Sequence, residues 1–387
     1  MIKRRPVKII LGVVLGLSVL CIGAVLIFYF TNQSLPTHSK DPVALSDSDQ
    51  ELYYEANHLR KELGGQVWPG WEQAKYIPFV AYNEAYAFLL GMADPPSGWT
   101  LPGKAAGRGA AWEAVGGSNV NPAGYYRQPV QNAAREIGAF TVRIGDTWVA
   151  CLPTYEWYQI EFFNGIRQQF PPIVKDILPY ALIRNTILGG RDRYITSQLH
   201  EAFHAYQSTV AYDRLLAAEN SVRLEGSYPW DNTQSEQAWK TEIDYLLKAV
   251  KSSTQDEAKS NTRQFLAQRQ ERRTTTSLSA ILVDFERQRE WLEGLAKYAE
   301  LSSGHFAAQS ATYKPLEAVG FKDYASYESF YNMQLDQVGS MTNNKEEVRF
   351  YYTGMAQALL LDRLLPGWKD HPLKTVFLED LLAEALQ

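Results

Sequence analysis

The chain has 387 residues, a formal net charge of −5 and 45% hydrophobic residues. That length is sufficient for one large domain or two modest ones with a sizeable core. The slightly acidic balance provides no electrostatic footprint for nucleic acid, so we expect no nucleic-acid partner. With only Cys21 and Cys151 available, a disulfide-rich secreted scaffold is excluded, and an exported domain without disulfides fits a bacterial surface protein.

The N-terminus has the pattern of an uncleaved signal-anchor. Basic residues occupy the segment 1–8, and residues 9–30 contain no charged residue, which is long enough for one transmembrane helix. Positive charge before the helix predicts a cytoplasmic segment 1–8 and an extracytoplasmic remainder, in the cell membrane. A cleaved signal peptide is the alternative, but the apolar run is long and no small-x-small site follows it. The spacing of Gly12 and Gly16 would permit weak dimerisation of the anchor.

The chain after the anchor begins with a polar linker over 31–45, followed by one domain over 46–387. A helix is predicted over 46–63, capped by Ser46 or Ser48 and stopped at Gly64-Gly65, and another over 81–90. The segment 93–129 is rich in Gly, Pro, Ser and Asn and predicts a long irregular stretch.

Alternating residues over 140–151 around Gly145-Asp146 predict a β-hairpin. Helical or mixed segments follow at 155–168 and 173–185, and Gly189-Gly190 breaks the chain. Four helices are then predicted over 211–225, 235–250, 256–273 and 277–303, the third facing solvent because it is almost wholly polar. The expected fold class is α+β, predominantly α, with a small N-terminal sheet.

The most informative stretch is the His-Glu-x-x-His pattern of His200, Glu201 and His204. On a helix the two histidines point the same way and can hold one metal ion, and Glu201 lies beside them where it can act on a water molecule. Two histidines and a glutamate on an otherwise apolar helix would be costly without partners. The pattern therefore predicts a Zn²⁺ site with His200 and His204 as ligands and Glu201 as the general base.

A third zinc ligand is required, and no histidine follows at short spacing, so a carboxylate is expected. The sequence from Glu290 to Glu300 resembles the second metal motif of the gluzincins, especially the aminopeptidase N family. The resemblance implies a zincin-like fold with Glu293 as a zinc ligand, and Tyr298 and Glu300 match the family positions that follow it. In this chain 89 residues separate His204 from Glu293, far more than in that family, so an inserted helical hairpin over 212–275 is implied. Glu225 is the alternative ligand.

A third segment, from Arg349 to Ala356, resembles the Tyr-x-Lys-Gly segment of the same family, with Thr353 in place of the usual lysine. The resemblance implies that Tyr351 donates a hydrogen bond to the transition-state oxygen; Tyr352 and simple core packing are the alternatives. The segment by which aminopeptidases bind a free amino terminus is absent, so aminopeptidase specificity is not implied.

Together these patterns predict a membrane-anchored zinc metallopeptidase that hydrolyses peptide or protein substrates. The edge of the 140–151 hairpin is predicted to bind an extended peptide by strand addition. Two alternatives remain at this level: a non-catalytic surface binding or scaffold protein with a degenerate zincin fold, and a zinc hydrolase acting on non-peptide amides. His305 and His371 are expected to be ordinary histidines.

Overall fold

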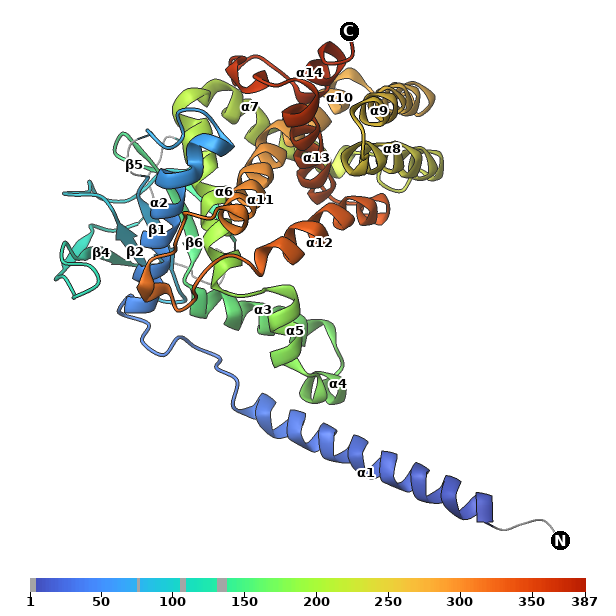
Figure 1. The fold of residues 1–387 in the computed structure, drawn as a ribbon. Helices are drawn as coiled ribbons and strands as arrows, with labels where there is room; N and C mark the ends of the chain where they lie inside the picture. The colour runs from blue at the N-terminus through green and yellow to red at the C-terminus, as the bar shows by residue number, and fades with distance from the viewer. Residues whose placement is uncertain (1–4, 75–76, 105–108, 131–137) are drawn as a thin grey trace.

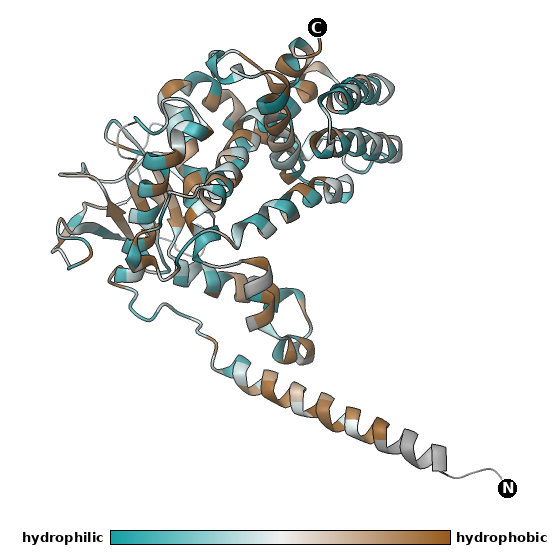
Figure 2. Cartoon of the chain, in the orientation of Figure 1, coloured by the Kyte–Doolittle hydropathy of each residue, from teal (hydrophilic) through white to brown (hydrophobic). Residues whose placement is uncertain are grey.

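The computed structural model describes residues 5–74, 77–104, 109–130 and 138–387. Helix α1 (Arg5–Gln33) extends away from the rest of the molecule, and the part of it that is coloured in Figure 2 is mostly hydrophobic. Its segment Val13–Gln33 is long and apolar enough to cross a membrane, and none of its most apolar 18-residue window is buried. The predicted apolar N-terminal helix is therefore confirmed. Lys3 and Arg4, which contribute to the predicted orientation, lie outside the described residues.

Helix α2 (Asp47–Val67) begins at the predicted cap, where the Ser46 hydroxyl accepts a hydrogen bond from the backbone N–H of Asp49. The predicted stop at Gly64-Gly65 is wrong, because the helix continues to Val67. It ends where Trp68 takes an extended conformation, and Gly70, at φ +85°, lies in the turn that follows.

Six strands form one mixed sheet in the order β3-β4-β2-β1-β6-β5 (Figure 1). Their bounds are β1 (Phe79–Tyr82), β2 (Tyr86–Leu90), β3 (Glu113–Val115), β4 (Tyr125–Pro129), β5 (Phe140–Ile144) and β6 (Thr147–Pro153). Strands β1 and β6 are parallel, whereas every other pairing is antiparallel. The predicted 140–151 hairpin is confirmed as β5 and β6, with Gly145 at φ +58° in the turn.

Two expectations for the sheet region are wrong. The predicted helix over 81–90 is instead the β1–β2 pair, whose tight turn is fixed by the Asn83 side chain accepting hydrogen bonds from the backbone N–H groups of Ala85 and Tyr86. The irregular stretch 93–129 contains the short strands β3 and β4.

Helices make up most of the remaining chain. The segments predicted at 155–168 and 173–185 are helical. The second is divided into two short helices by Leu178-Pro179. The helices in this part are α3 (Tyr155–Gln169), α4 (Pro172–Ile177), α5 (Tyr180–Ile187) and α6 (Arg191–Val210). Helix α6 carries the His-Glu-x-x-His pattern and packs against β6, α2 and α11.

The four helices predicted after the motif are all present. The elements are α7 (Tyr212–Ser221), a 3₁₀ helix (Val222–Ser227), α8 (Thr233–Lys251), α9 (Gln255–Thr275), α10 (Ala280–Arg289), a π-helical segment (Glu290–Gly294), α11 (Leu295–Gln309), α12 (Tyr327–Ser340), α13 (Val348–Leu364) and α14 (Leu378–Glu384). Helices α8 and α9 form a hairpin at one side of the molecule (Figure 1). The described chain is thus predominantly helical with a small mixed sheet.

The expectation that α9 faces solvent holds for only one face of the helix, because its other face is buried. Arg269, Arg272 and Arg273 on α9 are buried and form ion pairs with carboxylates from four other elements. We call this set the arginine network; its carboxylates are Glu242, Glu286, Glu290 and Glu379. Charges buried in this way require partners, and here every arginine has at least two.

Candidate metal centre

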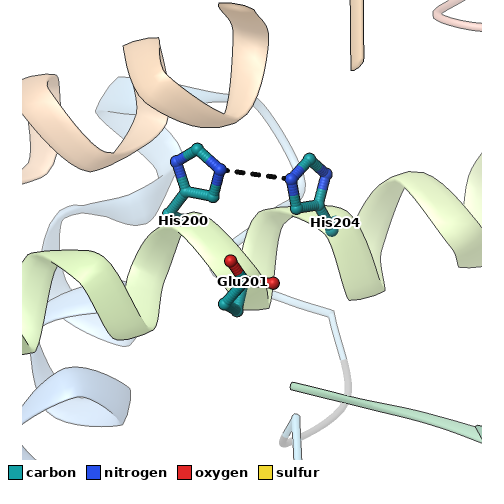
Figure 3. Close-up of side chains that lie close together, drawn as sticks. All are labelled: His200, Glu201 and His204. Carbon is teal, nitrogen blue, oxygen red and sulfur yellow. Dashed lines mark hydrogen bonds between the residues drawn. The ribbon is translucent and has the colours of Figure 1, made fainter. Parts of the chain in front are cut away.

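Helix α6 places His200, Glu201 and His204 in the interior, between the sheet and α11. All three side chains are buried, and potential ligand atoms from the three lie within 4.8 Å of one another. Figure 3 shows the two imidazoles on one side of α6, with the Glu201 carboxylate between them along the helix. This buried His-Glu-His group could hold a metal ion.

Glu293 approaches the same two histidines from the π-helical segment. Its Oε2 lies 3.4 Å from Nε2 of His200 and 3.3 Å from Nε2 of His204, and the two Nε2 atoms are 3.2 Å apart. The three atoms therefore form a nearly equilateral triangle. One cleft borders all three residues and Glu201.

The triangle fits a small tetrahedral metal ion. Zinc binds histidine nitrogen and carboxylate oxygen at about 2.0–2.1 Å, which places tetrahedral ligand atoms about 3.3 Å apart. The three measured separations, 3.2, 3.3 and 3.4 Å, match that spacing. Two imidazoles and one carboxylate are also a donor set that catalytic zinc sites use. The residues present therefore fit Zn²⁺.

Both histidines are held by their second ring nitrogen. Nδ1 of His200 lies 3.2 Å from Oε2 of Glu300, and Nδ1 of His204 lies 2.8 Å from Oε1 of Gln207. A proton on each Nδ1 leaves each Nε2 with a lone pair that points into the triangle. Lys297 in turn contacts Glu300 at 2.7 Å and fixes that carboxylate.

Contacts on two sides of the π-helical segment explain its conformation. On one side, Gln207 donates its side-chain amide to the carbonyl oxygens of Trp291 and Leu292, which a π turn leaves available. On the other side, α13 crosses the segment where glycine meets glycine. A Cβ atom on Gly294 would lie 2.5 Å from Cα of Gly354. Only two glycines permit this approach.

The close crossing brings Tyr351 of α13 to the site. Its ring is nearly parallel to that of His200, with the ring centroids 6.0 Å apart. Burial is the main cause that raises the pKa of Tyr351, and a hydrogen bond to Glu293 adds to it, so the phenol keeps its proton. Tyr351 is thus placed as a hydrogen-bond donor beside the triangle.

The surroundings shift the pKa values of Glu201 and Glu293 in opposite directions. Burial raises the pKa of Glu201, and this outweighs the opposing effect of the two histidines. For Glu293, burial acts in the same direction, but the histidines and Arg289 outweigh it and hold the pKa well below its usual value. Burial lowers the pKa of His200, but its hydrogen bonds to Glu293 and Glu300 prevail and raise it to about 10 in the metal-free site. Glu293 therefore stays ionised, while Glu201 is the more basic carboxylate.

Several residues of the site were missed at the sequence level. Arg289 donates to Oε1 of Glu293 at 2.8 Å and contacts Glu347 at 2.9 Å, and Gln207 orients His204. Helical spacing was the available signal, since Arg289 precedes Glu293 by four residues and Gln207 follows His204 by three.

The other glutamate and tyrosines that the sequence pointed to make their contacts away from the two histidines. Glu225 is in the 3₁₀ helix and accepts a hydrogen bond from the backbone N–H of Glu347, and in the described part of the chain no contact joins it to either histidine. Tyr352 donates to Gln334, and Tyr298 donates to Asp362. His305 stacks on Tyr331 and contacts Glu328, and His371 lies 3.7 Å from Glu384.

Two cavities meet at His200 and Glu201. One is an open cleft of about 730 Å³ that also borders Thr141 of β5 and Tyr351. The other is a smaller pocket of about 260 Å³, walled mainly by apolar and aromatic side chains that include Leu152 and Trp157. The site therefore has an open approach and a separate apolar recess.

Strand β5 is the edge strand on this side of the sheet. The outward N–H and C=O of Arg143 are already paired with Thr100. Because outward groups alternate along an edge strand, those of Thr141 also point away from β6, and Thr141 borders the cleft.

Comparison of the chain with models of known protein families, with curated proteins and with solved structures found no match.

Proposed function

We propose that this protein is a membrane-anchored, zinc-dependent peptidase with a zincin-like site of the gluzincin type. One observation carries the proposal: Nε2 of His200, Nε2 of His204 and Oε2 of Glu293 form a triangle with sides of 3.2–3.4 Å, beside a buried glutamate. That separation is what a tetrahedral zinc site requires of three protein ligands, with the fourth position open.

In this proposal, His200, His204 and Glu293 hold the ion. Bound zinc supplies Lewis acidity, which activates water near neutral pH and polarises a carbonyl group. Glu201 accepts the proton of the attacking water and delivers it to the leaving amine, and its raised pKa suits both roles. Tyr351 donates its phenolic hydrogen to the developing oxyanion.

The surroundings favour a peptide as the substrate. The outward backbone groups of Thr141 can pair with an extended chain in the cleft, which is recognition by strand addition. The apolar pocket beside Glu201 then accepts a large apolar side chain next to the scissile bond. Helix α1 anchors the enzyme, with its basic N-terminus in the cytoplasm and the site outside.

The test measures zinc and turnover on the same samples of the full chain in detergent. We expect one equivalent of zinc by elemental analysis and chelator-sensitive cleavage of casein or a peptide library. Glu201→Gln keeps the zinc and loses about 10²–10⁴-fold in turnover. Glu293→Ala weakens zinc binding by more than about 100-fold, since even second-shell losses cost about 10–100-fold.

Glu225→Ala is the matched control, because it removes a carboxylate that lies outside the triangle, and it should change neither property. An active Glu201→Gln enzyme would refute the mechanism. Zinc binding without turnover on peptides or other amides would instead support a binding protein. Turnover of non-peptide amides alone would keep the site and change the substrate.

A further inference from the structure

The C-terminal end of α1 is bound to the segment formed by α4 and α5. Asn32, buried at this junction, donates its side-chain amide to the carbonyl oxygens of Asp176 (3.0 Å) and Leu178 (2.8 Å). These are carbonyls at the end of α4, where the helix leaves them without partners of its own. Arg167 donates back to the carbonyl oxygen of Asn32 at 2.8 Å. The junction is therefore fixed by hydrogen bonds in both directions.

This junction places α4 at the level of the lipid headgroups. The apolar run of α1 ends at Phe30, and a helix rises 1.5 Å per residue, so Asn32 lies about 3 Å beyond the end of the run. The interfacial layer on each side of a bilayer is about 5–8 Å thick. The carbonyl groups that Asn32 contacts are thus held within that layer whenever α1 spans the membrane.

Large apolar side chains are exposed at this same place. Outside α1, ten large hydrophobic side chains are exposed among the residues that the structure describes, and four of them fall within 170–187. They are Phe170, Val174, Leu182 and Ile187, the last two about 60% exposed. Figure 2 shows hydrophobic colouring on α4 and α5 near the hydrophobic anchor. A soluble surface rarely concentrates such side chains without a partner.

The charges nearby match a lipid surface. The segment 165–188 contains three cations, Arg167, Lys175 and Arg184, and one anion, Asp176. Basic residues flanking exposed apolar side chains are the pattern of helices that lie in the membrane interface, where they meet anionic headgroups.

We propose that residues 170–187, which comprise the link after α3 together with α4 and α5, form an interfacial platform that inserts Phe170, Val174, Leu182 and Ile187 into the outer leaflet of a phospholipid bilayer. The platform rests on the membrane anchoring proposed above. It also fixes the site relative to the membrane: Trp157, which lines the apolar pocket, precedes Phe170 by 13 residues of helix α3, a distance of about 20 Å. Peptide bonds close to the membrane surface are therefore the ones within reach.

The experiment uses the full chain in vesicles of phosphatidylcholine and phosphatidylglycerol, with a nitroxide label whose depth is read from its accessibility to oxygen and to a water-soluble nickel chelate. Labels are attached to Leu182→Cys and Ile187→Cys in a Cys21→Ser background. Cys151 is buried, and the background chain checks that it stays unlabelled. Ile281→Cys on α10 is the matched control, since Ile281 is 55% exposed and Ile187 is 59% exposed.

We expect the labels at 182 and 187 about 5–10 Å below the headgroup phosphates, and the label at 281 in water. A label on the native Cys21 tests the anchor separately. If Cys21 lies in hydrocarbon while 182 and 187 lie in water, the platform is refuted and the anchor stands. If Cys21 lies in water, both fail. A label at 182 could instead be shielded from both reagents, with a spectrum broadened by the label of a second chain. That result would indicate a protein interface and refute the platform.

Discussion

The crossing of α13 over the π-helical segment offers a sharp test of how the site is built. Gly354 lies in the interior of a helix, where replacement by alanine ordinarily stabilises a protein by about 1 kcal/mol. Here a Cβ atom would lie 2.8 Å from Cα of Gly294 and closer still to the carbonyl oxygen of Glu290. Ordinary contacts begin at 3.4 Å, so the two backbones must separate by about 0.6 Å to clear Cα of Gly294 and by more to clear the carbonyl oxygen of Glu290.

Overpacking of this kind costs about 1–3 kcal/mol, and the upper end applies because both neighbours are backbone atoms that cannot rotate away. We therefore expect Gly354→Ala to lower the free energy of unfolding by about 2 kcal/mol after the helix-propensity gain of about 1 kcal/mol. Moving α13 also moves Tyr351, and a misplacement approaching 1 Å costs up to about 100-fold in rate. Zinc binding should weaken less than in Glu293→Ala, since His200 and His204 are on α6 and only Glu293 is on the segment that Gly354 contacts.

Gly165→Ala in α3 is the matched control, because a Cβ atom on this exposed helical glycine meets nothing within 4 Å. Urea unfolding followed by tryptophan fluorescence should place the two variants about 3 kcal/mol apart, with the control slightly more stable than the unmodified chain. If Gly354→Ala matched the control in stability and retained full activity, α13 would not approach Glu290 this closely and the placement of Tyr351 would be wrong.

Three further outcomes are expected. Tyr351→Phe should lower kcat about 10²–10³-fold with zinc retained, while Tyr352→Phe changes it little; equal effects would refute the oxyanion role. Arg269→Met should cost about 3–5 kcal/mol in urea unfolding by stranding buried carboxylates, against less than about 1 kcal/mol for Lys251→Met in an exposed ion pair, and equal costs would contradict the network. Burial raises the pKa of Glu286, but the arginines lower it to about 2, so its stabilisation is present above pH 4.5 and lost toward pH 2; a flat acid profile of unfolding would refute this.

The helices that carry the candidate metal ligands were predictable because their signal is local. His200 and His204 share one face of α6 by spacing alone, and the long apolar pattern around Glu293 predicts its helix. The π-helical segment was not predictable in this way. It depends on Gln207 and on the approach of α13 at Gly354, and both partners lie more than 50 residues away in sequence.

The strands β1 and β2 were missed for a different reason. Both faces of this part of the sheet are buried: Val80 and Leu89 belong to one apolar cluster, whereas Phe79 and Phe88 belong to the main core. Such strands show no alternation of polar and apolar residues, so a short apolar run cannot be distinguished from a buried helix. Only the turn at Asn83 carried the information.

The arginine network shows what part of the long segment between His204 and Glu293 contributes to the structure. Arg269 of α9 forms a paired hydrogen bond with the carboxylate of Glu290 at 2.8 and 2.6 Å, and Thr353 of α13 donates to the same carboxylate at 2.7 Å. Glu290 begins the π-helical segment that carries Glu293. The α8–α9 hairpin therefore supports the segment that carries Glu293, through one buried carboxylate. The sequence of α9 alone does not show that its arginines are buried, because their carboxylate partners are on α8, α10, α14 and the π-helical segment.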